Sequence, residues 1–124
     1  MAANIRIIHA HDFLKATPEG HLDLEESKKL LIEIASTAFL GGDYHIIVDT
    51  RRAQVEMSTT DLWYLAAGLS EHRKAFSGKT AILCPPERFD DAEFLALCAK
   101  NQGFNVRAFT SFEDALEWLN AKGT

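Results

Sequence analysis

The chain has 124 residues, 47% of them hydrophobic and 25% charged, a mixture that fits one globular domain over residues 1–124 and is too short for a (β/α)8 barrel. Its formal net charge of −5 repels phosphate backbones, so nucleic acid is not an expected partner. The sequence shows no secretory signal, no basic amphipathic stretch and no apolar run near the ~20 residues of a membrane span, so a cytoplasmic protein is expected.

The N-terminal part of the chain predicts a β-hairpin followed by a helix. Residues 5–10 are short, β-branched and mostly apolar, and residues 13–17 resemble a second strand that Pro18-Glu19-Gly20 ends. Asp23, followed three residues later by Glu26, has the spacing of a capping box at a helix start. The apolar stripe of this helix is Leu24, Leu30, Leu31, Ile34, Ala35, Ala38 and Phe39.

A strand and a second helix follow. Residues 44–49 are apolar on both alternating faces for most of their length, which predicts a central strand covered on both sides. The polar residues 51–54 are expected to form a loop. The second helix begins at Ser58, with Asp61 completing a capping box, and its apolar side is Leu62, Leu65, Ala66, Leu69 and Phe76.

The C-terminal part alternates strands with helices. It predicts a strand over 80–84, a helix capped by Asp90 or Asp91, a strand over 105–109, and a helix with a capping box of Ser111 and Asp114. Strands joined through helices must lie parallel. The order ββαβαβαβα therefore predicts an α/β fold with a mostly parallel five-stranded sheet and an N-terminal hairpin.

Histidine provides the most metal-like feature of the sequence. His9 and His11 are alternate residues of one strand, and His21 and His45 are further candidates. No aspartate or glutamate stands at a fixed spacing to complete a site, and surface histidines are common. No metal and no cofactor is predicted.

The sequence carries no constellation typical of an active site. Asp49 ends a central strand, as does the phosphoacceptor of response-regulator receiver domains, but the acidic pair and the lysine that this chemistry needs are missing. Glycine-rich nucleotide-binding patterns and the nucleophile elbow are also missing. No catalytic residue is predicted, and the protein is expected not to be an enzyme.

Four hydroxyl or carboxylate side chains, those of Ser58, Thr59, Thr60 and Asp61, open the second helix just beyond the carboxyl end of a strand. Open α/β sheets usually place their functional surface there. One interpretation is structural, with Ser58 capping the helix and Asp61 returning the hydrogen bond. The other is a phosphorylatable or anion-binding helix N-terminus, where backbone N–H groups and the helix dipole favour a phosphate.

Charged and aromatic side chains surround this helix start. Arg51 and Arg52, after the strand that ends at Asp49, could add charge-assisted hydrogen bonds to a bound anion. Trp63 and Tyr64 fall beside the apolar stripe of the helix, and each is four residues from one of the two threonines. Asp49, Arg51, Arg52, Trp63 and Tyr64 are predicted to form a partner- or ligand-binding surface, because aromatic side chains dominate binding interfaces.

The chain at this point resembles the STAS superfamily of anti-sigma-factor-antagonist domains, and within it the SpoIIAA-like group of small stand-alone proteins. The resemblance covers nearly the whole chain. It is carried by the element order, by Ile46-Ile47-Val48-Asp49-Thr50-Arg51 ahead of a polar-capped helix, and by the run from Gly103 to Leu119, which ends in Ala-Leu-x-Trp-Leu. It implies a right-handed βα superhelix around a mostly parallel sheet.

The resemblance also implies a switch at the start of the second helix. In family members this helix opens with Asp-Ser-Ser-Gly, and a partner kinase phosphorylates a serine there to switch protein binding. Thr59 falls at the phosphoserine position, with Thr60 and Ser58 as neighbouring phosphoacceptor candidates. Ser58 stands in place of the family's aspartate and Asp61 in place of its glycine.

Two alternative functions are therefore expected. The first is a non-catalytic regulatory module, phospho-switched at Thr59, that binds a regulatory kinase, an anti-sigma-like protein or a second copy in a homodimer. The second is a carrier or sensor of a small apolar or lipid-like ligand, because the SpoIIAA-like group shares its fold with Sec14-type lipid-binding domains. A continuous apolar cavity would favour the ligand. A packed core beneath an exposed Trp63–Tyr64 pair would favour the protein partner.

Overall fold

A computed structural model describes residues 4–10, 13–41 and 45–121, with residues 4–10 and 38–41 described as backbone only. The strands are β1 (Asn4–Ala10), β2 (Phe13–Leu22), β3 (His45–Asp49), β4 (Ala53–Val55), β5 (Lys79–Leu83) and β6 (Asn105–Phe109). The α-helices are α1 (Leu24–Gly41), α2 (Thr59–Gly68), α3 (Phe89–Asn101) and α4 (Phe112–Asn120), with short 3-10 helices at Leu69–His72 and Pro86–Arg88.

The strands form one twisted sheet in the order β1-β2-β3-β5-β6. The hairpin pair β1–β2 is antiparallel, and β3, β5 and β6 continue the sheet in parallel. This path confirms the predicted α/β fold with a mostly parallel sheet and an N-terminal hairpin. The strand β3 lies between β2 and β5, so the predicted central position of residues 45–49 is confirmed, while Tyr44 lies outside the described residues.

The second strand is longer than predicted, because Pro18 does not end it. β2 continues to Leu22 and changes its parallel partner on the way, pairing with β3 as far as Ala16 and with β4 from Gly20 onward. Pro18 lies in the interval between these two ladders and is fully buried. The predicted loop over 51–54 is wrong at its end, because Ala53 and Gln54 belong to the strand β4. No local sequence pattern indicates the short ladder that β4 forms with β2.

Two helix boundaries also differ from the predictions. The helix α2 ends at Gly68 and tightens into a 3-10 turn, because glycine is a weak helix former; Phe76, beyond that turn, is nevertheless buried. The N-cap of α3 is Arg88, the last residue of the 3-10 turn, whereas Asp90 and Asp91 lie in the first helical turn, where the helix dipole favours carboxylates.

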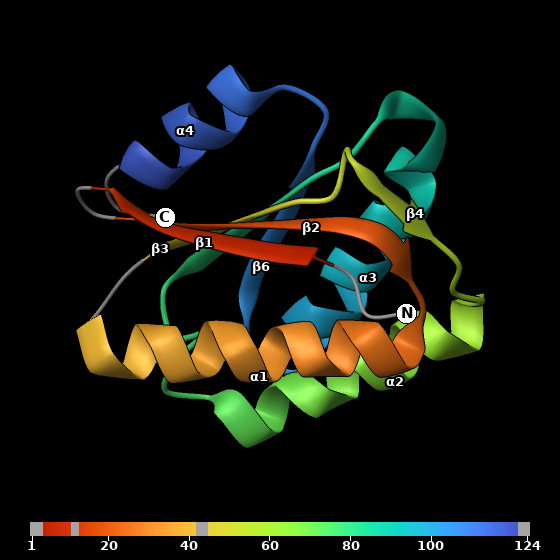
Figure 1. The fold of residues 1–124 in the computed structure, drawn as a ribbon, viewed down its shortest axis with the longest axis horizontal. Helices are drawn as coiled ribbons and strands as arrows, with labels where there is room; N and C mark the ends of the chain where they lie inside the picture. The colour runs from red at the N-terminus through yellow and green to blue at the C-terminus, as the bar shows by residue number, and fades with distance from the viewer. Residues whose placement is uncertain (1–3, 11–12, 42–44, 122–124) are drawn as a thin grey trace.

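Helices cover both faces of the sheet, with α4 on one side and α1 and α2 on the other (Figure 1). The larger core packs α1, α2 and α3 against the sheet, and the smaller core packs α4 against it. Side chains alternate along β3, so Ile46 joins the larger core and Ile47 the smaller one. The same alternation places Val48 toward α2 and Asp49 on the α4 side.

Candidate functional site

The start of α2 forms the capping box that the sequence predicts. The hydroxyl of Ser58 accepts a hydrogen bond from the backbone N–H of Asp61 at 3.1 Å, and the carboxylate of Asp61 accepts one from the backbone N–H of Ser58 at 3.0 Å. Ser58 therefore has the structural role that the first interpretation gives it. Thr59 and Thr60, the first two residues of the helix, are exposed.

The aromatic pair of α2 faces solvent. Trp63 is 50% exposed and Tyr64 is 54% exposed, and their rings meet edge to face with centroids 5.2 Å apart. The buried residues of the helix, Leu62, Leu65 and Ala66, lie on its other side. Neither aromatic ring is part of the core, and together with the two threonines they define what we call the α2 surface: Thr59, Thr60, Trp63 and Tyr64.

Asp49 is buried at the end of the central strand, and Arg51 folds back over it. The Nε of Arg51 lies 3.0 Å from Oδ1 of Asp49, and Nη2 lies 3.0 Å from Oδ2. The backbone N–H of Arg51 donates to Oδ1 at 3.1 Å, and the ammonium group of Lys15 lies 3.8 Å from Oδ2. Burial acts to raise the pKa of Asp49, but the hydrogen bonds and charge of Arg51, with the charge of Lys15, outweigh it and hold the pKa below its ordinary value.

The structure divides the predicted binding residues into two groups on opposite sides of the sheet. Asp49 and Arg51 belong to the α4 side, because Lys15 also lies 4.9 Å from the ring of Phe112 on α4 and the charge of Glu113 acts on Arg51. The α2 surface lies on the other side (Figure 1).

Arg52, although 72% exposed at its side chain, is paired with Glu19 of β2 at 3.1 Å. Both arginines of the loop are thus engaged by acidic side chains of the sheet. These contacts direct neither arginine toward the start of α2. The residues from Asp49 to Arg52 therefore form a structural turn.

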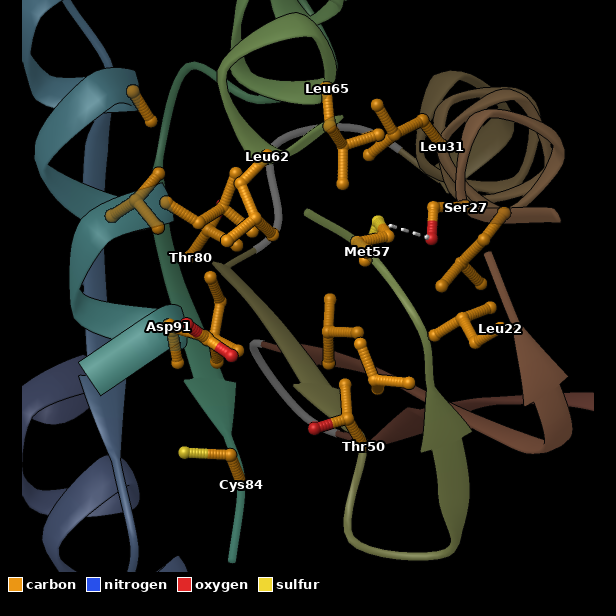
Figure 2. A pocket seen from close by; sticks show the side chains of 18 of the residues that line it. Leu22, Ser27, Leu31, Thr50, Met57, Leu62, Leu65, Thr80, Cys84 and Asp91 are labelled. Atoms are coloured by element: carbon orange, nitrogen blue, oxygen red, sulfur yellow. Dashed lines mark hydrogen bonds between the residues drawn. The ribbon is translucent and has the colours of Figure 1, made fainter. Parts of the chain in front are cut away.

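A cavity lies between the sheet and the helices α1, α2 and α3, and sequence reasoning did not locate it. Its volume is about 110 Å³, and its wall is almost wholly apolar. Figure 2 shows Leu62 and Leu65 of α2, Leu31 of α1 and Thr80 of β5 around it. No local pattern signals such a space, because it depends on how far three helices stand from the sheet.

Three polar side chains of the cavity wall, those of Ser27, Thr50 and Arg88, are bonded within the protein. The hydroxyl of Ser27 donates to the sulfur of Met57 at 3.4 Å, as Figure 2 shows, and the hydroxyl of Thr50 donates to the carbonyl of Leu83 at 2.9 Å. The guanidinium of Arg88 donates to the carbonyls of Thr50 and Ala53 at 2.6 and 3.0 Å. Among the described residues, every buried side-chain nitrogen and oxygen has a partner. The wall therefore offers little to a polar occupant.

The thiol of Cys84 also lines this cavity. Burial raises its pKa, so the sulfur stays protonated and is a poor nucleophile. Both cysteines are free, with Cys84 buried and Cys98 partly buried.

The histidines do not gather in the part of the chain that the structure describes. His45 accepts a hydrogen bond from the backbone N–H of Lys79 at 3.0 Å, and His21 lies 3.0 Å from Glu56. Within residues 13–37 and 45–121, no group of three His, Cys, Asp or Glu side chains could hold a metal ion. The side chains of His9 and His11 lie outside the described residues. No helix among the described residues is long and apolar enough to cross a membrane.

Solved structures with the same arrangement of strands and helices belong to the SpoIIAA-like fold. An uncharacterised DUF3478-family protein from Shewanella loihica, described as having a SpoIIAA-like fold, is 22% identical, with a TM-score of 0.59 over 95% of this chain and 94% of that one. The resemblance seen in the sequence is thus confirmed at the level of the fold. No protein-family model matches the chain, and no curated protein sequence matches it.

Two further neighbours are anti-sigma factor antagonists. The unphosphorylated form of SpoIIAA is 18% identical, with a TM-score of 0.56 over 97% of this chain and 99% of that one. An anti-sigma factor antagonist from Mycobacterium paratuberculosis is 12% identical, with a TM-score of 0.65 over 97% and 96% of the two chains. At these identities the likeness establishes the fold and leaves function to the site.

Proposed function

We propose that the protein is a non-catalytic regulatory module of the STAS type that binds a protein partner through the α2 surface. The observation that carries this proposal is the pair of half-exposed rings, Trp63 and Tyr64, one helical turn from a capped helix start. Large aromatic side chains in such positions are the residues that most often anchor interfaces. The capping box fixes the start of the helix, so the rings are presented on a defined surface.

The fold supports a regulatory partner over a substrate. Neighbours with this fold include two structures of anti-sigma factor antagonists, and the partner expected here is a regulatory kinase or an anti-sigma-like protein. A second copy of the chain, forming a homodimer through the same surface, is the alternative partner. Asp49, Arg51 and Arg52 serve this function indirectly, because their ion pairs hold the turn between β3 and β4.

Thr59 is the proposed phosphoacceptor. The hydroxyl of Ser58 is held in the capping box, whereas Thr59 is exposed at the first helical position. One neighbour of this fold is SpoIIAA in its phosphorylated form, 17% identical with a TM-score of 0.55. A phosphate on Thr59 would add about −1.5 to −2 charges beside the helix N-terminus and would change what the α2 surface can bind.

Affinity capture with matched variants tests the binding proposal. The wild type, Trp63→Ala and Leu97→Ala are compared for each captured protein, with Leu97 as the control because it is an apolar side chain of α3 that is 57% exposed. Trp63→Ala should weaken binding of the true partner by about 2 kcal/mol, roughly thirtyfold, while Leu97→Ala leaves it unchanged. The proposal fails if Trp63→Ala binds every captured protein as tightly as the wild type does.

Phosphorylation is tested separately by incubating the protein with cell lysate and ATP and mapping the modified site. Thr59→Ala should remove the phosphate, and Thr60→Ala is the control that retains it. Modification confined to Ser70, an exposed serine beyond the end of α2, would contradict the assignment.

The cavity supports a second candidate function, the sensing of a small apolar ligand. Its volume of about 110 Å³ lies below the ~300–1,000 Å³ of pockets that hold drug-sized molecules, so Sec14-like carriage of a whole lipid does not fit this geometry. Native mass spectrometry of the purified protein tests it. A bound small molecule that is lost on unfolding would support the ligand function, and a protein of unmodified mass would count against it.

A further inference from the structure

The helix α2 packs over the cavity. It has 10 residues, and two of its three buried side chains, Leu62 and Leu65, line the cavity together with Leu69, which follows the helix. A side chain beside a void loses the dispersion contacts that a filled core would give it. The apolar face of α2 therefore makes fewer packing contacts with the sheet than a filled core would provide.

The same helix carries the exposed rings on its outer side. Trp63 follows Leu62 directly and Tyr64 precedes Leu65, so the cavity wall and the α2 surface alternate along one helical turn. The backbone that carries Leu62 and Leu65 therefore also carries Trp63 and Tyr64. The cavity and the surface are two sides of one element.

The size and polarity of the cavity define what could fill it. An engineered protein cavity of about 150 Å³ with an apolar wall stays dry and binds benzene or xenon, and this cavity has about 110 Å³. Ser27, Thr50 and Arg88 already donate hydrogen bonds within the protein, and the surface of the cavity wall is almost wholly apolar. The occupant that fits is a small, neutral, apolar molecule, no larger than a single ring or a short branched chain.

We infer that a small apolar molecule bound in this cavity tightens α2 against the sheet and thereby orders the α2 surface for its partner. The partner step rests on the proposed function, whereas the ordering of α2 does not. Ligand and partner then bind with positive coupling. Whichever binds first orders α2, so the second binds without losing that conformational entropy again.

One of the two tryptophans can serve as an internal control for the effect of the ligand. The chain has two tryptophans, Trp63 on α2 and Trp118 on α4. Trp118 packs against the smaller core on the other side of the sheet, and no residue of that core lines the cavity. A ligand in the cavity should therefore act on the indole of Trp63 and leave that of Trp118 unchanged.

Benzene is the probe for the experiment. ¹⁵N-labelled protein is titrated with benzene while the two indole N–H resonances and the hydrogen exchange of backbone amides are followed. The expected result is a saturable shift at Trp63, none at Trp118, and exchange of the α2 amides that slows roughly tenfold at ten times the dissociation constant. The amides of α4 should exchange at an unchanged rate.

Two variants that fill the cavity provide the control. Val48→Ile and Ala92→Leu add apolar atoms to its wall from β3 and from α3, and each should abolish the benzene response. Two variants are used to guard against overpacking at one position, and a folded example of either is sufficient. Circular dichroism establishes which of them folds.

Several outcomes would overturn the inference. These are the absence of saturable binding, equal shifts at both indoles, a response that survives in a folded cavity-filled variant, or binding without slower exchange of α2. The proposed function is judged separately by partner capture with Trp63→Ala. If capture fails to depend on Trp63, the partner step is lost while the benzene titration still decides whether the cavity orders α2.

Discussion

The guanidinium group of Arg51 binds both carboxylate oxygens of Asp49, two residues before it in the chain, with both hydrogen bonds at 3.0 Å. Asp49 is 5% exposed, so its carboxylate is a buried charge, compensated by Arg51, at the end of the central strand. Arg51 is thereby directed toward the sheet, and its backbone N–H is also committed to the same carboxylate. The contact fixes the turn through which the chain passes from β3 to β4.

Replacing Asp49 by Asn should destabilise the protein by about 1–3 kcal/mol. The amide accepts fewer hydrogen bonds than the carboxylate and leaves the charges of Arg51 and Lys15 without their counter-ion. Urea unfolding at neutral pH measures the loss. Asp90→Asn, an exposed change in the first turn of α3, should cost less than about 0.5 kcal/mol. Equal stabilities of wild type and Asp49→Asn would show that the pair contributes nothing.

The same pair predicts a pH dependence. The pKa of Asp49 in the folded protein lies below its ordinary value, because Arg51 and Lys15 outweigh the effect of burial. The stabilisation is therefore complete above the unfolded pKa of about 3.9 and is lost as the pH falls through the lower folded value. The stability difference between wild type and Asp49→Asn should shrink when urea unfolding is repeated at successively lower pH below about 4. A difference that stays constant there would contradict this assignment.

Ser58→Ala should cost about 1 kcal/mol, because it removes the hydroxyl that accepts from the backbone N–H of Asp61 at the start of α2. Thr59→Ala is the matched control, since Thr59 is exposed at the next position and is expected to change stability little. Thermal unfolding of the two variants measures both effects. A Thr59→Ala variant that loses more stability than Ser58→Ala would assign Thr59 a structural role and weaken its assignment as phosphoacceptor.

Lys79→Met should destabilise the C-terminal end of α4. The buried ammonium group of Lys79 donates to the carbonyls of Trp118 and Ala121 at 2.8 and 2.6 Å, where the helix dipole favours a cation. Losing these charged hydrogen bonds should cost about 1–3 kcal/mol. Near-ultraviolet circular dichroism should report a loosened Trp118. Lys74→Met is the control because Lys74 is exposed, and an equal loss in both variants would rule out this role for Lys79.

Val48→Ile should stabilise the protein by up to about 1 kcal/mol, because the added methylene enters the cavity. Ala81→Val is the matched control on the neighbouring strand. Ala81 is fully buried in the smaller core, outside the cavity wall, and overpacking there should cost about 1–3 kcal/mol. Urea unfolding compares the two. If Val48→Ile destabilises the protein as much as Ala81→Val does, the cavity has no room for the added methylene in solution.

The local features of this protein follow from the sequence alone. The capping contacts of Ser58 with Asp61 and of Ser111 with Asp114 join residues three apart, so the pattern that predicts them also contains both partners. The central strand was predictable because residues 45–49 are apolar on both faces, which only a covered position in a sheet explains. The places of Trp63 and Tyr64 beside the apolar stripe of α2 indicated that at least one ring is exposed, and the structure exposes both.

The tertiary structure decided what depends on distant partners. Pro18 lies inside a strand because β2 changes its neighbour there, and Ala53 joins the sheet because Gly20 lies opposite it. Alternation along β3 places Asp49 on the α4 side, and its hydrogen bonds to Arg51 hold that residue there too, away from the α2 surface that the sequence grouped with them. The cavity exists only because α1, α2 and α3 meet the sheet without filling the space between them. A sequence pattern records which side chains are apolar, but a void is set by the distances between elements that the chain brings together from far apart.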